Sequence, residues 1–176
     1  IYKAGGKARS WNRFLFDELT CFHNTHVFVD GDAEVVPGSI EALARGLHAH
    51  KGINAASALP MNGRRADYYQ QAMRSAHGLF GDLYALRGEF LARMKQGGIR
   101  LPDDVIGEDG LICAMAKTDL ATESHLIDLR VAVCEGAGFL CAPVSAISPK
   151  SWRMQYHRMI NYSVRHYQNA MISRIM

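Results

Sequence analysis

The strongest constraint on the fold is an apolar run from Thr25 to Asp30 that is rich in β-branched and aromatic residues. A run of this length and make-up predicts a buried β-strand. After a turn at Pro37-Gly38, the apolar residues between Ser39 and Leu47 recur at helical spacing. The segment from Ile53 to Leu59 is a second short apolar run. Strand, helix and strand in this order predict a parallel crossover and therefore an α/β fold.

The rest of the chain continues the alternation of strands and helices. "GDLYAL" predicts a strand, "GEFLARMKQ" a short helix, and a glycine- and acid-rich loop leads into a helix that starts near Glu108. We therefore expect a mixed, mostly parallel sheet flanked by helices. Residues 1–150 are expected to form this α/β core, and residues 151–176 a basic, Met- and Tyr-rich C-terminal helix.

Net charge limits the classes of binding partner, and the cysteine pattern indicates the cellular compartment. The net charge of +3 and a pI near 8.7 are only mildly basic, which speaks against a nucleic-acid partner. Positive charge gathers in residues 151–176, which include no acidic residue, so this segment suits contact with an anionic membrane surface. None of the four cysteines forms a CxxC pair, and the chain has no secretory leader pattern, so we expect free thiols in the cytoplasm.

Two aspartates follow the first strand in "VFVDGD". In an extended segment residues two apart point the same way, so Asp30 and Asp32 can present both carboxylates to one point at the carboxyl end of a strand. Two hard oxygen donors suit Mg²⁺ or Mn²⁺. The structural alternative is an Asx turn. An EF-hand loop would need glycine where Val35 stands, and a haloacid-dehalogenase-type phosphatase prefers Thr or Val where Glu34 stands.

A second acidic pair, Glu108 and Asp109, opens the helix after Gly107. Carboxylates in a first helical turn are favoured by the helix dipole, and this explanation needs no chemistry. The functional interpretation is a general base held at a rigid helix end, which takes a proton from an acceptor hydroxyl.

Two further motifs carry positive charge. In "GGKARSWN", glycines ahead of Lys7 can bring backbone and ammonium close to a phosphate, although the spacing is not that of a P-loop. In "QYHRM", Gln155 and Arg158 share one helix face, and an arginine there can bind phosphate oxygens in a forked geometry. A solvated surface position is the alternative for each.

The order of these motifs is more specific than any one of them. "GGKARSWN", "VFVDGD", "GDLYALRGEFL", "GEDGLI" and "QYHRM" follow one another between Gly6 and Met159. This order resembles that of the family-2 glycosyltransferases, which include cellulose- and hyaluronan-synthase-like enzymes. The chain departs from the family pattern at Met159, where the family has tryptophan, and it starts downstream of the family's first nucleotide-binding strands. The resemblance thus describes an N-terminally truncated member.

The resemblance implies a GT-A fold, with a Rossmann-like sheet, and inverting transfer of a sugar from a nucleotide-sugar to an acceptor hydroxyl. It also assigns roles to residues matched position by position. These are Asp30 and Asp32 for the metal, Asp109 as general base with Glu108 beside it, Lys7, Asn12, Gln155 and Arg158 on the donor side, and Arg87 on the acceptor side.

The partners follow from the same resemblance. They are Mn²⁺ or Mg²⁺, a nucleotide-sugar donor, with a UDP-sugar favoured, and a glycan or lipid-linked acceptor, at the inner face of a membrane. Two other functions stay open. One is a metal-dependent phosphatase of the haloacid-dehalogenase type, with Asp30 as nucleophile, and the other is an inactive glycosyltransferase-like binding module.

Overall fold

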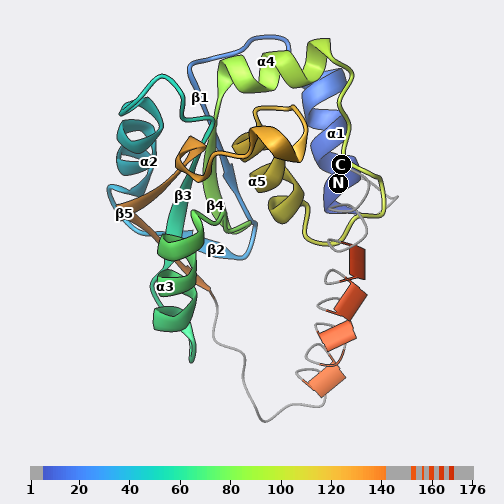
Figure 1. Cartoon of the computed structure of the whole chain (residues 1–176). Helices are drawn as coiled ribbons and strands as arrows, with labels where there is room; N and C mark the ends of the chain where they lie inside the picture. The colour runs from blue at the N-terminus through green and yellow to red at the C-terminus, as the bar shows by residue number, and fades with distance from the viewer. Residues whose placement is uncertain are drawn as a thin grey trace.

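A computed structural model describes residues 6–141 and, further along the chain, residues 152–153, 156, 159–160, 163–164 and 167–168. Residues 6–141 form a five-stranded mixed sheet with helices on both faces (Figure 1). The predicted α/β fold with flanking helices is confirmed. The predicted boundary between residues 150 and 151 lies outside the described residues.

The sheet has the strand order β1-β4-β3-β5-β2. Its strands are β1 (Thr25–Val29), β2 (Ala33–Val35), β3 (Ala55–Pro60), β4 (Leu83–Arg87) and β5 (Val131–Cys141). Strand β3 is parallel to β5, whereas β1–β4, β3–β4 and β2–β5 are antiparallel pairs. The expectation of mostly parallel pairing is therefore corrected for the described residues.

The insertion of β4 explains this difference. As the crossover pattern predicted, β1 and β3 run in the same direction, but β4 lies between them and runs the opposite way. The chain that leads to β4 returns past the middle of β3, where the Ser57 Oγ accepts a hydrogen bond from the N–H of Phe80 at 3.0 Å, and β4 then runs back toward Ala55. Because β4 starts beside Ser57 and runs toward Ala55, its pairing with β3 is antiparallel.

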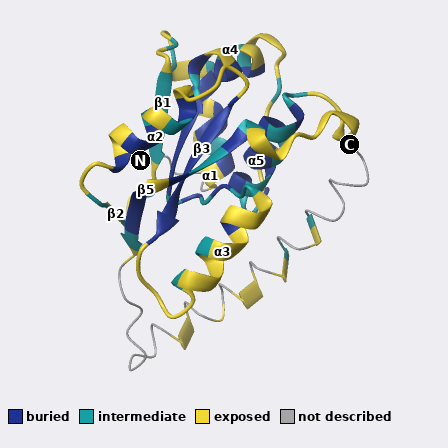
Figure 2. Ribbon diagram, turned by 60° about the vertical axis from the view of Figure 1, so that its left-hand side comes forward, coloured by how far each residue is buried: buried dark blue, intermediate teal, exposed yellow. Residues whose placement is uncertain are grey.

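Helices cover both faces of the sheet (Figure 1). One face carries α1 (Lys7–Arg13), which continues as a π-helical turn (Phe14–Glu18), together with α4 (Gly88–Gln96) and α5 (Glu108–Thr118). Helix α2 (Ser39–His48) packs on the other face. Helix α3 (Ala66–Ala76) is largely exposed, with Met73 its buried residue (Figure 2).

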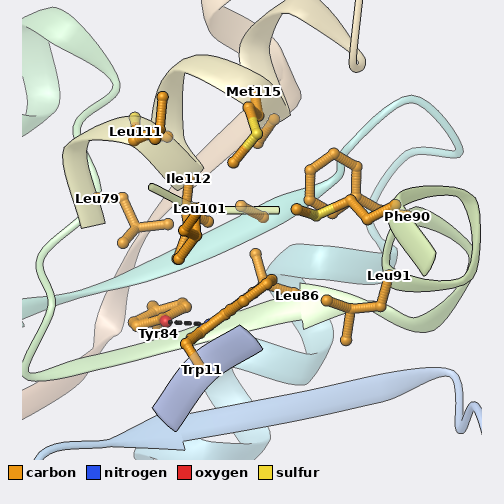
Figure 3. Packing of buried hydrophobic residues seen from close by; sticks show 14 of the residues in the cluster. Trp11, Leu79, Tyr84, Leu86, Phe90, Leu91, Leu101, Leu111, Ile112 and Met115 are labelled. Carbon is orange, nitrogen blue, oxygen red and sulfur yellow. Dashed lines mark hydrogen bonds between the residues drawn. The ribbon is translucent and has the colours of Figure 1, made fainter. Parts of the chain in front are cut away.

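Side chains along β4 point alternately to the two faces of the sheet, so the hydrophobic core has two parts. Tyr84 and Leu86 face the side of α1, α4 and α5, whereas Leu83 and Ala85 face α2. The indole Nε1–H of Trp11 donates a hydrogen bond to the buried Tyr84 hydroxyl at 3.2 Å (Figure 3). This bond fixes α1 against the centre of the sheet.

Strand β5 is bulged, and its last residues pair with the edge strand β2. A register shift between Ser57 and Leu59 marks a bulge in β5. Beyond the bulge, β5 pairs with β2, and Ala33 lies opposite Cys141. The end of β5 therefore reaches the turn that carries the two predicted aspartates. Within the described part of the chain, no helix has the length and apolar character needed to span a membrane.

Candidate active site

Three carboxylates meet at one end of the sheet. Asp30, Asp32 and Asp82 each offer an oxygen, and these oxygens lie within 4.8 Å of one another. The first two are the pair predicted after β1. The turn between them is stabilised by a hydrogen bond from the N–H of Ala33 to the carbonyl oxygen of Asp30 at 3.1 Å.

Asp82 is the member that sequence reasoning missed. It precedes β4, whose first residue, Leu83, lies opposite Val29 at the end of β1. The N–H of Asp30 donates to the carbonyl oxygen of Asp82 at 2.9 Å. In an antiparallel pair the start of one strand lies beside the end of its neighbour, so the "GD" before "LYAL" was the available signal.

The electrostatics of this cluster favour a bound cation. Burial, followed by the negative charge of Asp30, raises the pKa of Asp82 above the ordinary value for an aspartate. A divalent cation would relieve this repulsion, and three carboxylates are the hard oxygen donors that Mn²⁺ and Mg²⁺ prefer. The residues present fit such an ion.

Lys7 joins the aspartates to the acidic helix end. Its Nζ lies 2.5 Å from an Asp30 carboxylate oxygen and 2.9 Å from Glu108 Oε1, and it also approaches the Gly81 carbonyl oxygen at 3.4 Å. Burial alone would lower the pKa of Lys7, but its hydrogen bonds to Asp30 and Glu108 raise it. The Lys7 side chain remains 44% exposed, so its ammonium can reach a ligand at the cluster.

The predicted acidic pair lies in the first turn of α5, and both residues are buried. Glu108 turns toward Lys7. Asp109 packs against Gly81, where an added Cβ would lie 3.3 Å from the Asp109 carboxyl group. Since Gly81 directly precedes Asp82, the structure brings the predicted base next to the predicted metal site.

A cavity of about 320 Å³ opens beside this pair. It lies between the start of α1 and the loop that precedes α5. Its lining residues are Gly6, Lys7, Asp103, Asp104, Val105, Ile106, Gly107 and Glu108.

Asn12 is close to the site but is bound to the backbone. Its Nδ2 donates to the Leu101 carbonyl oxygen at 2.8 Å, and its Oδ1 accepts from the Leu101 N–H at 2.9 Å. Nδ2 also approaches Asp103 Oδ1 at 3.4 Å. Buried in this way, Asn12 holds the loop before α5 and leaves no polar atom for direct donor contact.

Arg87 lies apart from the cluster. It stands opposite Thr25 at the far end of β4, roughly 16 Å along the extended chain from Asp82. Its guanidinium donates to the carbonyl oxygens of Leu47, Ile53 and His50. These contacts fasten α2 to the start of β3 and hold the Arg87 guanidinium away from the acidic cluster.

Two predicted donor-side residues belong to the C-terminal segment. Gln155 and Arg158 lie outside the described residues. The structure thus brings together Asp30, Asp32, Lys7, Glu108 and Asp109, and adds Asp82.

Comparison with known proteins supplies the fold type. No family model matches the chain, and no curated protein matches it. A solved structure does resemble it: the mannosyltransferase PcManGT from Pyrobaculum calidifontis, in complex with GDP-Man and Mn²⁺. The similarity has a TM-score of 0.61 at 20% sequence identity and covers 94% of this chain. This chain therefore shares the fold of the matched part of that enzyme. It spans 44% of the length of the mannosyltransferase.

Proposed function

We propose that the protein is a metal-assisted glycosyltransferase of the GT-A type, which moves a sugar from a nucleoside-diphosphate-sugar to an acceptor hydroxyl. The observation that carries this proposal is the meeting of Asp30, Asp32 and Asp82 with Lys7 and the Glu108-Asp109 pair at one end of a glycosyltransferase fold. A cation site, a flexible positive charge and a buried acid pair are the parts that such a transfer needs.

The chain's residues divide the chemistry among them. Asp30, Asp32 and Asp82 would hold the ion, which when bound acts as a Lewis acid on the leaving diphosphate. Lys7 adds a second positive charge to the same leaving group. Asp109 takes the proton of the acceptor hydroxyl as that oxygen attacks the anomeric carbon from the face opposite the diphosphate. This geometry inverts the anomeric configuration.

Glu108 keeps Lys7 at the cluster. Its carboxylate is buried and contacts the Lys7 ammonium at 2.9 Å, so it limits where the flexible lysine side chain can go. Gln155 and Arg158 stay as predicted donor-side residues from the motif resemblance. We assign no acceptor contact to Arg87, because main-chain carbonyl groups already occupy its guanidinium.

Two donor classes deserve testing. The motif resemblance favours a UDP-sugar, whereas the structurally similar mannosyltransferase was solved with GDP-Man. The acceptor is a glycan or a lipid-linked sugar.

The direct test is release of nucleoside diphosphate from a panel of UDP- and GDP-sugars, with Mn²⁺, by the full-length protein. We expect release to require the metal, to increase with acceptor and to be lost in Asp82→Asn. Glu123→Gln is the matched control, because Glu123 is exposed and lies beyond the far end of α5.

Metal titration and a phosphoryl-transfer assay on the same protein separate the alternatives. Metal binding without any turnover would favour the inactive binding module. Transfer of a phosphoryl group to Asp30 would favour the phosphatase, for which the fold comparison offers no support. Either result would overturn the proposed transfer.

The C-terminal segment adds a membrane contact to the proposal, at the inner, cytoplasmic face. Its described residues are helical, and Trp152, Tyr156 and Met159 are exposed, Trp152 to 70%. Aromatic residues beside arginines, in a segment without acidic residues, suit an anionic bilayer surface. Co-sedimentation with vesicles that contain phosphatidylglycerol tests this contact. Equal binding to neutral phosphatidylcholine vesicles, or no binding, would contradict it.

A further inference from the structure

Gln168, far along the chain, contacts the loop that leads into the acidic pair. Its Oε1 accepts a hydrogen bond from the main-chain N–H of Ile106 at 2.9 Å. Its Nε2 donates to the carbonyl oxygen of Asp104 at 3.2 Å. One side-chain amide thus pairs with a donor and an acceptor of the loop backbone. In Figure 1 the last described piece of the C-terminal segment, in red, ends beneath the loop that joins α4 to α5.

The loop bound by Gln168 also forms a wall of the site. Residues 103–108 line the 320 Å³ cavity together with Gly6 and Lys7. Glu108 and Asp109 follow Ile106 after Gly107, whose φ of 83° places it in the left-handed region. A shift of the backbone at Ile106 therefore changes the position of Glu108 and of its contact with Lys7.

The other anchors of the loop hold its first half. Asn12 binds Leu101 and approaches Asp103. Arg9 pairs with Asp104 at 2.9 Å through exposed side chains, and such surface pairs constrain a backbone weakly. Gln168 adds a hydrogen bond to the backbone of the second half of the loop, at Ile106, two residues before Glu108.

We infer that Gln168 is a positioning residue, which ties the C-terminal segment to the Glu108-Asp109 pair and holds that pair in its reactive position. This inference rests on the proposed glycosyltransferase function for its catalytic consequence. The hydrogen-bonded clamp itself depends only on the contacts of Gln168 with Asp104 and Ile106. Gln168 acts through the loop and touches no reacting atom.

The test uses Gln168→Met, which keeps the length of the side chain and removes both hydrogen bonds. The matched control is Ser163→Ala, because Ser163 lies in the same segment and its Oγ donates to Met159. Amide hydrogen exchange at Ile106 is expected to accelerate about tenfold in Gln168→Met and to stay unchanged in the control. Unchanged exchange at Ile106 in Gln168→Met would overturn the clamp.

Steady-state kinetics test the catalytic consequence. We expect kcat to fall about tenfold in Gln168→Met, with a smaller change in KM for the donor sugar, because a misplaced acid pair slows the chemical step more than it weakens donor binding. Faster exchange at Ile106 together with an unchanged kcat would overturn the positioning role. Absence of turnover in the unsubstituted protein would instead overturn the proposed function, and hydrogen exchange would still decide whether the clamp exists.

Discussion

The main-chain N–H of Asp30 donates a hydrogen bond to the carbonyl oxygen of Asp82 at 2.9 Å, and this contact sets two carboxylates from distant parts of the chain side by side. The antiparallel pairing of β1 with β4 is the cause, since it places the end of one strand beside the start of the other. The acidic cluster is therefore a direct consequence of the strand order.

The raised pKa of Asp82 predicts a stability effect. Its carboxyl group holds a proton more tightly in the folded chain than in the unfolded one, chiefly because of burial and then because of Asp30. Without metal, ionisation of Asp82 therefore destabilises the fold as pH rises above about 4, the usual aspartate pKa. We expect Asp82→Asn to raise the metal-free melting temperature at pH 7 by about 2 °C. Glu123→Gln is the control.

The metal-free melting temperature of Asp82→Asn can also contradict this prediction. If Asp82→Asn melts below the unsubstituted protein in the absence of metal, the carboxylate stabilises the fold rather than straining it. With Mn²⁺ the order should reverse, because only the unsubstituted protein gains stability from the ion.

Replacement of Lys7 should separate ion binding from diphosphate binding. Lys7→Met removes the ammonium that contacts Asp30, so Mn²⁺ alone should bind at least as tightly as before. The same change should weaken nucleoside diphosphate binding in the presence of Mn²⁺ about tenfold, because one charged contact to phosphate is lost. Calorimetry of both ligands measures this. Lys51→Met, at an exposed turn, should change neither value. Equal diphosphate affinity in Lys7→Met would exclude a donor-side role.

Replacement of the predicted base should affect the chemical step alone. We expect Asp109→Asn to lower kcat by about 10²- to 10⁴-fold, the usual contribution of a positioned general base. Donor affinity should be unchanged, because Asp109 packs on Gly81, whereas Glu108 is the member of the pair that contacts Lys7. Asp128→Asn, which alters an exposed residue paired with Lys117, should leave kcat unchanged. A fall in kcat of less than threefold in Asp109→Asn would remove Asp109 from the mechanism.

The bond between Trp11 and Tyr84 should be visible in stability. Tyr84→Phe leaves the buried Trp11 Nε1–H without its acceptor, which costs about 1–3 kcal/mol of unfolding free energy. Urea denaturation measures the change. Tyr68→Phe, on the exposed side of α3, serves as the control. Identical unfolding midpoints for the two variants would mean that water replaces the lost acceptor.

The local elements could be predicted from sequence because their signals are local. β-Branched and aromatic residues identify β1, and apolar spacing identifies α2. The acidic start of α5 also stands where predicted, at Glu108. Strand order is not local. The pattern of strand, helix and strand did not reveal that β4 separates β1 from β3 and runs in the opposite direction.

The candidate site also contains residues that local sequence patterns identify and one residue that they do not. Asp30 and Asp32 were predictable because one short segment holds both of them. Asp82 was not, because it joins them through tertiary pairing. Arg87 and Asn12 show that a motif match does not fix the contacts of a side chain. Each residue matched a pattern, and in the structure each binds main-chain groups. A motif gives the residue type and position, whereas the fold decides which way the side chain turns.

The metal-dependent diphosphate site is tested most directly by calorimetric titration of UDP and of GDP into the protein with Mn²⁺, without metal, and with Mn²⁺ in Asp32→Ala. We expect at least one nucleotide to bind only with Mn²⁺, and Asp32→Ala to abolish this binding. Binding that survives removal of the metal or the Asp32→Ala change, or no binding under any condition, would contradict a diphosphate–metal site at Asp30, Asp32 and Asp82.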